Sequence, residues 1–200
     1  MLSHIAHDPQ PTAETSSAPL SQRRAHAAGV WDAAGLPTPR LESWKHTSLR
    51  PMTRALESAS PMSVEAAAPE LEGVSGVVIL VNGVVDLAAS SVPTEITLLD
   101  LTSDAPASLG SVAPLERLED ALSARNLASF DRGVAIQIAA NTRLVAPLEL
   151  RYLYTEGGRD SIESRLLIEV AHHAELNLIE RHYAPDGLVQ AVNHVVEIDL

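Results

Sequence analysis

The feature of this sequence that most restricts its fold is a succession of short β-type runs that fills the chain after Gly133. The runs are residues 134–138, 148–154, 166–170, 176–179 and 195–200. Their starts are about 10 to 19 residues apart, and no amphipathic helix long enough for a βαβ crossover lies between them. Residues 135–138 and 175–180 alternate apolar and polar side chains, which places one face of each strand in a core. The pattern therefore predicts stacked turns of β structure.

Two architectures fit this pattern about equally well on physical grounds. A parallel β-helix buries the aliphatic face of each turn on its neighbours, and an antiparallel barrel or cupin-type sandwich buries a similar face. The composition suits either, because 46% of the 200 residues are apolar and only 3% are aromatic, so the core is aliphatic. A chain of this length buries about 70% of the surface that its unfolded form exposes. A wholly disordered protein is therefore excluded.

The charge of the chain and its lack of cysteine exclude several classes of partner and site. The formal net charge is −12 at pH 7, which repels phosphate backbones and anionic lipid surfaces. We therefore expect neither a nucleic acid nor a membrane as a partner. Without cysteine, the chain has no disulfide, no cysteine-ligated zinc and no thiolate for an iron–sulfur cluster. No apolar run reaches the roughly 18 residues that span a bilayer and no signal-like segment occurs among the first twenty residues, so we expect a cytoplasmic protein.

The N-terminal third of the chain is expected to be a tail followed by helices. Residues 1–18 are rich in Ser, Thr, Pro and His, which is typical of a mobile tail. Residues 19–72 form a helical region, with one helix predicted at 19–34 because a proline can occupy its first turn and a glycine follows its end. A second short helix is predicted at 41–49, and we expect Pro51 to end it.

The middle of the chain changes from helical to β-type patterns. Residues 57–72 read as a linker or a weakly ordered helix, and residues 73–133 then lead into the core. Asn82 and Gly83 separate two β-branched runs, and an Asn-Gly pair in that position is a strong hairpin signal. The elements expected in this region are a hairpin at 77–87, a strand at 96–101 and a helix at 114–130. Residues 134–200 are then predicted to form the first turns of the β architecture.

One segment near the N-terminus resembles a known family. Residues 35–49 read G-L-P-T-P-R-L-E-S-W-K-H-T-S-L. This resembles the signature G-L-P-T-x-R-x-E-x-W-K-Y-T-x-L found near the start of SufD, an iron–sulfur cluster assembly protein of the SUF system. The spacing matches throughout, and the one evident departure is His46, where the family usually has tyrosine.

Five weaker motifs extend the resemblance from about residue 20 to residue 200. Residues 81–83 resemble the F-V-N-G hairpin of the family, with Leu80 in place of the aromatic residue. The other four matches are 122–133 to A-L-N-x-A-F-x-x-D-G, 146–150 to x-x-P-I-H-L, 178–181 to L-I-E-R and 192–198 to x-N-x-V-x-E-I. The Trp-Lys segment is fairly specific, whereas each strand motif is individually weak.

The resemblance implies a mainly β fold, in which a helical N-terminal region precedes a right-handed parallel β-helix. It also implies a non-catalytic subunit of an iron–sulfur cluster assembly scaffold. In the family, SufD pairs with the β-helix homologue SufB, and the ABC-type ATPase SufC docks on C-terminal helices. The iron–sulfur cluster is then expected at the level of the complex, and ATP in the SufC-like partner.

Members of the family are about twice as long as this chain. The sequence stops inside the β-type run at 195–200, so we expect it to be the N-terminal part of a longer, SufD-like protein. The SufB-facing and SufC-docking residues of the family lie in the other half. The resemblance therefore assigns no catalytic, cofactor-binding or metal-ligating residue to this chain.

A group of histidines suggests an alternative function. His172, His173 and Glu175, with Glu180, His182 and His194 nearby in sequence, could supply imidazole and carboxylate ligands to iron or zinc. The alternative is then a cupin-like or β-solenoid metal-dependent enzyme that uses His172, His173 and Glu175. Adjacent residues of a strand point to opposite faces, so both histidines reach one ion only from a turn. The cupin H-x-H spacing is absent, and we favour a solvated turn.

Trp44 and Lys45 are a second candidate site, because Trp offers a large apolar face and Lys45 is the only lysine. We favour the simpler interpretation, in which Trp44 pins the N-terminal helices and Lys45 is solvated. The sequence contains neither a G-x-S-x-G nucleophile elbow nor a G-x-x-x-x-G-K-[ST] phosphate loop. ATP hydrolysis is therefore expected in a partner.

Overall fold

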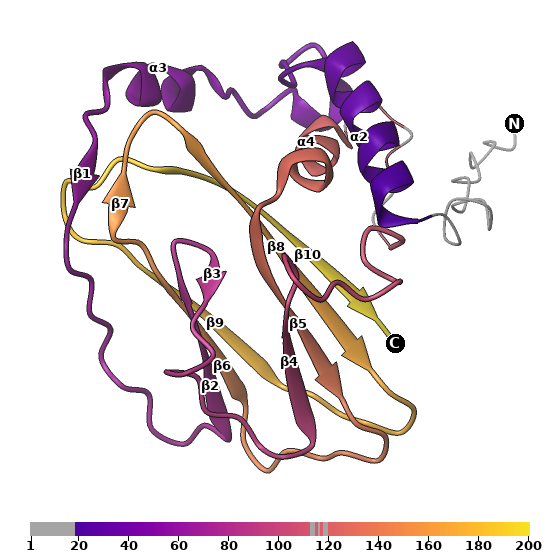
Figure 1. Ribbon diagram of the computed structural model, residues 1–200. Helices are drawn as coiled ribbons and strands as arrows, with labels where there is room; N and C mark the ends of the chain where they lie inside the picture. The colour runs from indigo at the N-terminus through magenta and orange to yellow at the C-terminus, as the bar shows by residue number, and fades with distance from the viewer. Residues whose placement is uncertain (1–18, 113–114, 116, 118–119) are drawn as a thin grey trace, which may run out of the picture.

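The computed structural model of the protein describes residues 19–112, 115, 117 and 120–200, so the expected tail at 1–18 lies outside the described residues. The helical segments are α2 (Leu20–Ala34), the 3-10 helix η1 (Glu42–Trp44), α3 (Arg50–Ser58) and α4 (Ala121–Ser129). The strands are β1 (Met62–Ser63), β2 (Gly76–Val81), β3 (Val84–Val85), β4 (Ile96–Asp100), β5 (Arg132–Ile138), β6 (Leu148–Leu153), β7 (Glu156–Gly157), β8 (Ser161–Val170), β9 (Leu178–Tyr183) and β10 (Ala191–Asp199) (Figure 1).

These strands form two four-stranded sheets and one two-stranded sheet. The strand orders are β3-β2-β6-β9, β10-β8-β5-β4 and β1-β7. From β5 onward the long strands alternate between the two larger sheets, because β5, β8 and β10 belong to one sheet and β6 and β9 to the other. Segments far apart in sequence therefore lie side by side, such as β2 and β6 (Figure 1).

The expected right-handed parallel β-helix is wrong as a description of this fold. The described strands belong to three separate sheets, and β1–β7, β2–β3 and β4–β5 are antiparallel pairs. The described part of the chain is therefore a mixed α/β fold whose sheets neither close nor join into a solenoid. Residues 134–200 supply β-strands to all three sheets rather than the first turns of a β-helix. Hydrophobic periodicity shows which face of a strand is buried, but not its partner or direction.

The antiparallel barrel and the cupin-type sandwich do not fit either. β6 is parallel to both of its neighbours, β2 and β9, and β8 is parallel to both β5 and β10. Chain segments long enough to return to the same end of the sheet connect these parallel strands, and each passes through the opposite sheet.

The strands of the β10-β8-β5-β4 sheet are buried on both faces. Val134, Ile136 and Leu166 belong to the core between the two larger sheets. Ala135 and Leu167, one residue along, belong to a second core beneath α2 and α4. Because successive side chains of a strand point to opposite faces, this alternation joins the sheets on one side and the helices on the other. Figure 1 shows α2 beside α4 over this sheet, with α3 lying apart from them.

Local turn chemistry correctly predicted the hairpin and the first helix. Asn82 and Gly83 have φ angles of 50° and 84° and connect β2 to β3, as the Asn-Gly signal predicted. The first helix is Leu20–Ala34, with Gly35 following at φ 63°. Of the helix expected at 114–130, the described part is Ala121–Ser129, and residues 114, 116, 118 and 119 lie outside the described residues.

The second helix was predicted in the wrong place. Residues 41–49 contain only the short turn η1, and α3 begins where the predicted helix was to end. The reason is Pro51, which occupies the first turn of α3. Proline lacks the N–H that the first turn of a helix leaves unpaired, so it is compatible with a helix start as well as with a helix end.

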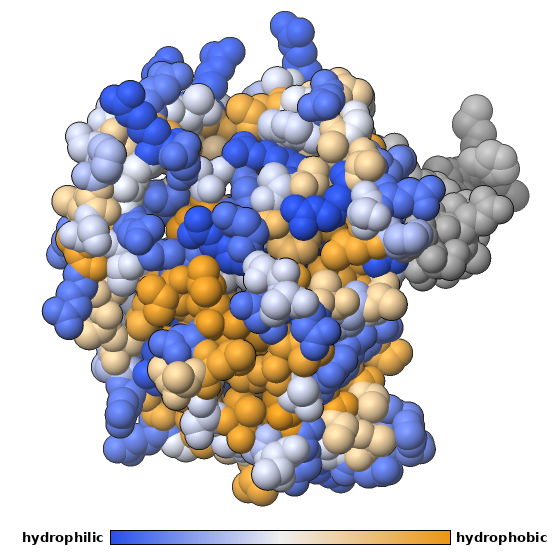
Figure 2. Space-filling view, in the orientation of Figure 1, coloured by the Kyte–Doolittle hydropathy of each residue, from blue (hydrophilic) through white to orange (hydrophobic). Residues whose placement is uncertain are grey.

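The surface follows the same division between sheets and helices. Figure 2 shows apolar side chains gathered over the region of the sheets, while polar side chains predominate around the helices. Among the described residues, no helix is both long and apolar enough to cross a membrane.

Candidate functional site

The histidine pair singled out in the sequence lies in an exposed turn between β8 and β9. His173 has a left-handed backbone, with φ 59°, and the rings of His172 and His173 are 5.5 Å apart between centroids at an interplanar angle of 76°. The Glu175 carboxylate is bound by Arg143, with 2.5 Å between Oε1 and Nη2. The carboxylate that would complete a metal site is thus already paired, and these contacts give the metalloenzyme alternative no support.

Trp44 and Lys45 lie in and beside η1, on the connection between α2 and α3. Trp44 is half-buried, whereas Lys45 is exposed and pairs with Glu42 one turn earlier. The solvated lysine agrees with the simpler interpretation of this segment.

A polar cluster that the sequence analysis did not assemble lies between the two larger sheets. We call it the edge cluster, and its members are Tyr152, Tyr154, Ser164, Glu180, His182 and His194. Tyr152 on β6 is in register with His182 on β9, and Ser164 on β8 is in register with His194 on β10. β9 and β10 are the last strands of their sheets in the described part of the chain. Residues from both sheets therefore meet at the edge of the core.

Hydrogen bonds and ring contacts link the members of the edge cluster. The Tyr154 hydroxyl is 2.9 Å from His182 Nδ1, and His182 Nε2 is 2.6 Å from Glu180 Oε1. The rings of Tyr152 and His182 are stacked, with centroids 4.5 Å apart. These contacts form one chain of groups across β6 and β9.

His194 is held in the same way on the opposite sheet. Its Nδ1 is 2.9 Å from the Ser164 hydroxyl and its Nε2 is 3.0 Å from the Tyr152 hydroxyl. Its Nε2 is also 4.0 Å from Glu180 Oε1. Both imidazoles therefore direct Nε2 toward the Glu180 carboxylate, and a hydroxyl holds each Nδ1.

Burial sets the protonation of the edge cluster. It raises the pKa of Tyr154 to about 12 and raises the pKa of Tyr152 further, with the Glu180 charge adding to both effects. Both phenols therefore remain protonated and can donate hydrogen bonds at neutral pH. Burial lowers the pKa of His194, although the nearby Glu180 carboxylate opposes that effect. His194 is thus held as a neutral imidazole.

Ser164, His194 and Glu180 follow one another in the order of a catalytic triad, but the arrangement does not suit nucleophilic catalysis. Ser164 is only 2% exposed, so its hydroxyl has no open side from which a substrate carbonyl could approach. The cluster offers ligand atoms rather than a nucleophile.

The signal that could have located the edge cluster is the parity of β9. Leu178 shares its strand face with Glu180 and His182, because side chains two residues apart point the same way. The alternation at 175–180 already placed Leu178 on the buried face. Continuing the same parity to His182 places both polar side chains toward the core.

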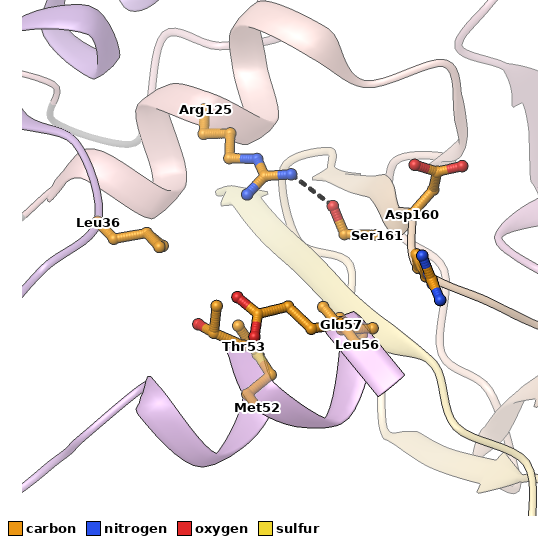
Figure 3. Close-up of a pocket in the computed structure, with 10 residues that line it drawn as sticks. Leu36, Met52, Thr53, Leu56, Glu57, Arg125, Asp160 and Ser161 are labelled. Atoms are coloured by element: carbon orange, nitrogen blue, oxygen red, sulfur yellow. Dashed lines mark hydrogen bonds between the residues drawn. The ribbon is translucent and has the colours of Figure 1, made fainter. Parts of the chain in front are cut away.

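A cleft of about 420 Å³ separates α3 from the start of β8 and β10. Its lining residues are Leu36, Met52, Thr53, Leu56, Glu57, Arg125, Arg159, Asp160, Ser161 and Ala191. Figure 3 shows Met52, Thr53 and Glu57 of α3 facing Arg125 of α4 across the open space. None of the α3 side chains is fully buried, so this helix roofs the cleft without being anchored in a core.

The polar groups of the cleft bond mainly to the protein itself. Arg125 donates to the Ser161 hydroxyl over 2.6 Å and pairs with Glu163 over 2.9 Å. Arg159 donates from Nε to the Ala59 carbonyl. The ten lining residues contain no histidine or other neutral base beside Ser161. The cleft therefore has the walls of a binding site but not the groups of a catalytic one.

Comparison of the chain with protein-family models and with curated proteins finds no match.

Proposed function

We propose that this chain belongs to a non-catalytic scaffold subunit for iron–sulfur cluster assembly, similar to SufD. The subunit works in the cytoplasm with a SufB-like homologue and a SufC-like ABC-type ATPase, and binds neither nucleic acid nor membrane. One observation carries the proposal: the segments that resemble SufD are far apart in sequence but contact one another through their polar residues. A chance resemblance between isolated short motifs gives no reason for such contacts.

The first of these contacts joins residues 81–83 to residues 122–133. Arg132 donates from Nη1 to the Asn82 carbonyl over 2.9 Å. The Asn82 side chain is itself fixed, because its Oδ1 accepts from the Thr155 backbone N–H over 2.8 Å. The hairpin motif is thus tied to the end of the helix motif.

The second contact joins residues 146–150 to residues 178–181. Glu149 is fully buried, and its carboxylate binds Arg181 over 2.9 Å and Arg151 over 2.8 Å. The glutamate of one strand motif is therefore neutralised by the arginine of another.

The third contact joins the helix motif to residues 192–198. Asn126 of α4 donates from Nδ2 to the Asn193 carbonyl over 2.7 Å and to the Ser164 carbonyl over 2.8 Å. Its Oδ1 accepts from Arg165, which pairs with Glu197 of β10. The distinctive polar residues of these motifs thus hold the fold together, and a structural subunit uses them in this way.

Two sheet edges suit a protein partner. In the described part of the chain, β9 and β10 each pair on one side only. On β10 the side chains of Val192, Val196 and Ile198 are 38%, 40% and 51% exposed. Unpaired backbone groups and apolar side chains together favour addition of a β-strand from a partner. This favours a β-rich partner such as a SufB-like homologue over a small molecule.

The iron–sulfur cluster is cargo in this proposal. Cysteine thiolates are the usual ligands of such clusters and this chain has none, so the partner supplies them. The subunit contributes position rather than cluster ligands, and the purified chain alone is expected to hold no cluster.

An affinity pull-down from cells of the source organism tests the proposal, with the tag at the N-terminus and the partners identified by mass spectrometry. We expect a SufB-like homologue and a SufC-like ATPase to be recovered with the chain. The matched control is the double variant Val196→Asp/Ile198→Asp, which places charge on exposed positions of β10 and should release the SufB-like partner. Recovery of neither partner with the unaltered chain contradicts the proposal. So does a cluster-like visible absorption band that stays with the lone chain through gel filtration.

A further inference from the structure

The arrangement of the edge cluster is that of a metal-ligand set closed on itself. Three side chains that can ligate a metal ion, Glu180, His182 and His194, come from strands of two different sheets. Glu180 Oε1 is 2.6 Å from His182 Nε2 and 4.0 Å from His194 Nε2. One carboxylate oxygen thus lies between two imidazole nitrogens.

The outer nitrogen of each imidazole is already held. The Tyr154 hydroxyl is 2.9 Å from His182 Nδ1 and the Ser164 hydroxyl is 2.9 Å from His194 Nδ1. A hydroxyl can accept as well as donate, so each can take the Nδ1 proton and leave Nε2 as a lone-pair donor. Ligating histidines are oriented in this manner by a partner on their second nitrogen.

Small movements convert this set into a coordination shell. For tetrahedral zinc with bonds of about 2.0 to 2.1 Å, ligand atoms lie about 3.3 Å apart. The Glu180–His182 pair must therefore open and the Glu180–His194 pair must close, each by less than about 1 Å. As the described residues stand, no three such side chains surround a common point, because Glu180 and His182 bond directly to each other.

Solvent can reach the three groups. The side chains of His182 and Glu180 are 43% and 33% exposed, while that of His194 is 12% exposed. An ion can thus enter from the edge of the sheets and displace the proton between Glu180 and His182. The Tyr152 hydroxyl, 3.0 Å from His194 Nε2, must move aside for the same ion.

We propose that Glu180, His182 and His194 form a binding site for a divalent transition-metal ion, with Zn²⁺ as the probe that defines it. Two imidazole nitrogens and one carboxylate oxygen suit Zn²⁺, Co²⁺ and Fe²⁺. They leave one position of a tetrahedral shell for water or for a group of a bound partner. The site rests on side-chain geometry alone and is independent of the scaffold proposal.

Isothermal titration of the untagged, metal-free chain with ZnCl₂ tests the site, and Co²⁺ absorption reports the geometry. We expect one ion per chain, and a Co²⁺ spectrum of tetrahedral intensity. His182→Gln and Glu180→Gln alter partly exposed side chains, and each should weaken Zn²⁺ binding at least tenfold with an unchanged circular dichroism spectrum. Tyr154→Phe removes only the group that orients His182 and should weaken binding about tenfold.

The double variant His172→Gln/His173→Gln is the matched control, because it removes two exposed histidines outside the edge cluster. It should bind Zn²⁺ as the unaltered chain does. The site is contradicted by the absence of a one-to-one Zn²⁺ complex, or by binding that survives His182→Gln and Glu180→Gln. Loss of binding in the control double variant would instead assign the ion to the turn between β8 and β9.

Discussion

Two polar groups on the same pair of strands, β8 and β10, have opposite surroundings. On the face toward the helices, Arg165 and Glu197 pair over 2.5 Å and both side chains are fully buried. On the face toward the other sheet, Ser164 and His194 belong to the edge cluster, which opens to solvent through His182 and Glu180. Neighbouring residues of one strand thus enter either a closed network or an accessible one.

The comparison shows what distinguishes a structural polar group from one available for binding. The Glu197 carboxylate accepts from the backbone N–H groups of Gly110 and Val112 as well as from Arg165, so fixed donors occupy it. In the edge cluster, Glu180 bonds to one side chain that can move. Burial with rigid partners holds a fold together, whereas partial exposure with mobile partners leaves a group free to exchange a proton for a ligand.

The largest effect is expected from Glu197→Ala, which breaks the closed network. It leaves Arg165 buried without a counter-charge, and removal of one partner of a buried ion pair costs about 3 to 5 kcal/mol. Urea unfolding should show this loss of stability. The matched control is Arg143→Met, which breaks the exposed pair with Glu175 and should cost less than about 1 kcal/mol. Equal losses in the two variants would remove the distinction between closed and accessible groups.

The second effect concerns Glu149, a buried carboxylate whose arginine partners reach solvent. The hydrogen bond from Arg151 lowers the pKa of Glu149, with the charges of Arg151 and Arg181 assisting and burial opposing. Because its folded pKa is depressed, its contribution is fully present above its ordinary value of 4.5 and is lost as the pH falls through the lowered pKa.

We therefore expect Glu149→Gln to lose about 2 to 3 kcal/mol at neutral pH, in the range of hydrogen bonds to charged groups. Below the ordinary carboxyl pKa, the difference from the unaltered protein should shrink. Urea midpoints measured from neutral to acidic pH give both quantities. A difference that stays constant with pH would show that the Glu149 charge contributes nothing to stability.

A smaller loss is expected from Asn126→Ala, which removes the amide that connects α4 to the strands. The carbonyls of Ser164 and Asn193 and one N–H of Arg165 lose their partner, and each loss of this kind costs about 1 to 3 kcal/mol, partly recovered by water. Thermal unfolding should show the loss. Asn126→Asp, which keeps the acceptor for Arg165 but not the donor, should recover part of it; no recovery would show that the bond to Arg165 is unimportant.

The smallest effect on stability is expected from His182→Gln in the accessible group. Substitutions at exposed positions usually change stability by less than about 0.5 kcal/mol, while Zn²⁺ binding should fall at least tenfold. Thermal unfolding without metal, combined with the Zn²⁺ titration, separates the two effects. A loss of stability as large as that of Glu197→Ala would place His182 with the structural groups.

Much of the local structure could be predicted from sequence, because it depends on local chemistry. Asn82 and Gly83 predicted their hairpin through their tolerance of positive φ, and the glycine after residue 34 marked the end of the first helix. Pro51 was ambiguous, because proline is compatible with the first turn of one helix and with the end of another. Local signals mark a boundary without saying what lies on each side.

The long-range arrangement could not be predicted, because it depends on pairs of distant residues. The strand predicted at 166–170 begins at Ser161, since Glu163 and Arg165 looked like solvent-facing residues. Both are buried, with Glu163 beside Arg125 and Arg165 beside Glu197. A buried ion pair is invisible until both partners are placed. The edge cluster was missed for the same reason, because its histidines are close only across two sheets.

The position of α3, over the cleft and outside both cores, has a consequence for the timescale on which the cleft exists. A helix without a fully buried side chain opens by local unfolding, while α4 is tied by Asn126 to strands that open only with the whole protein. The backbone amides of α3 should therefore exchange with deuterium far sooner than those of α4. The volume beneath α3 is then a time average, a recess closed for part of the time and open surface for the rest.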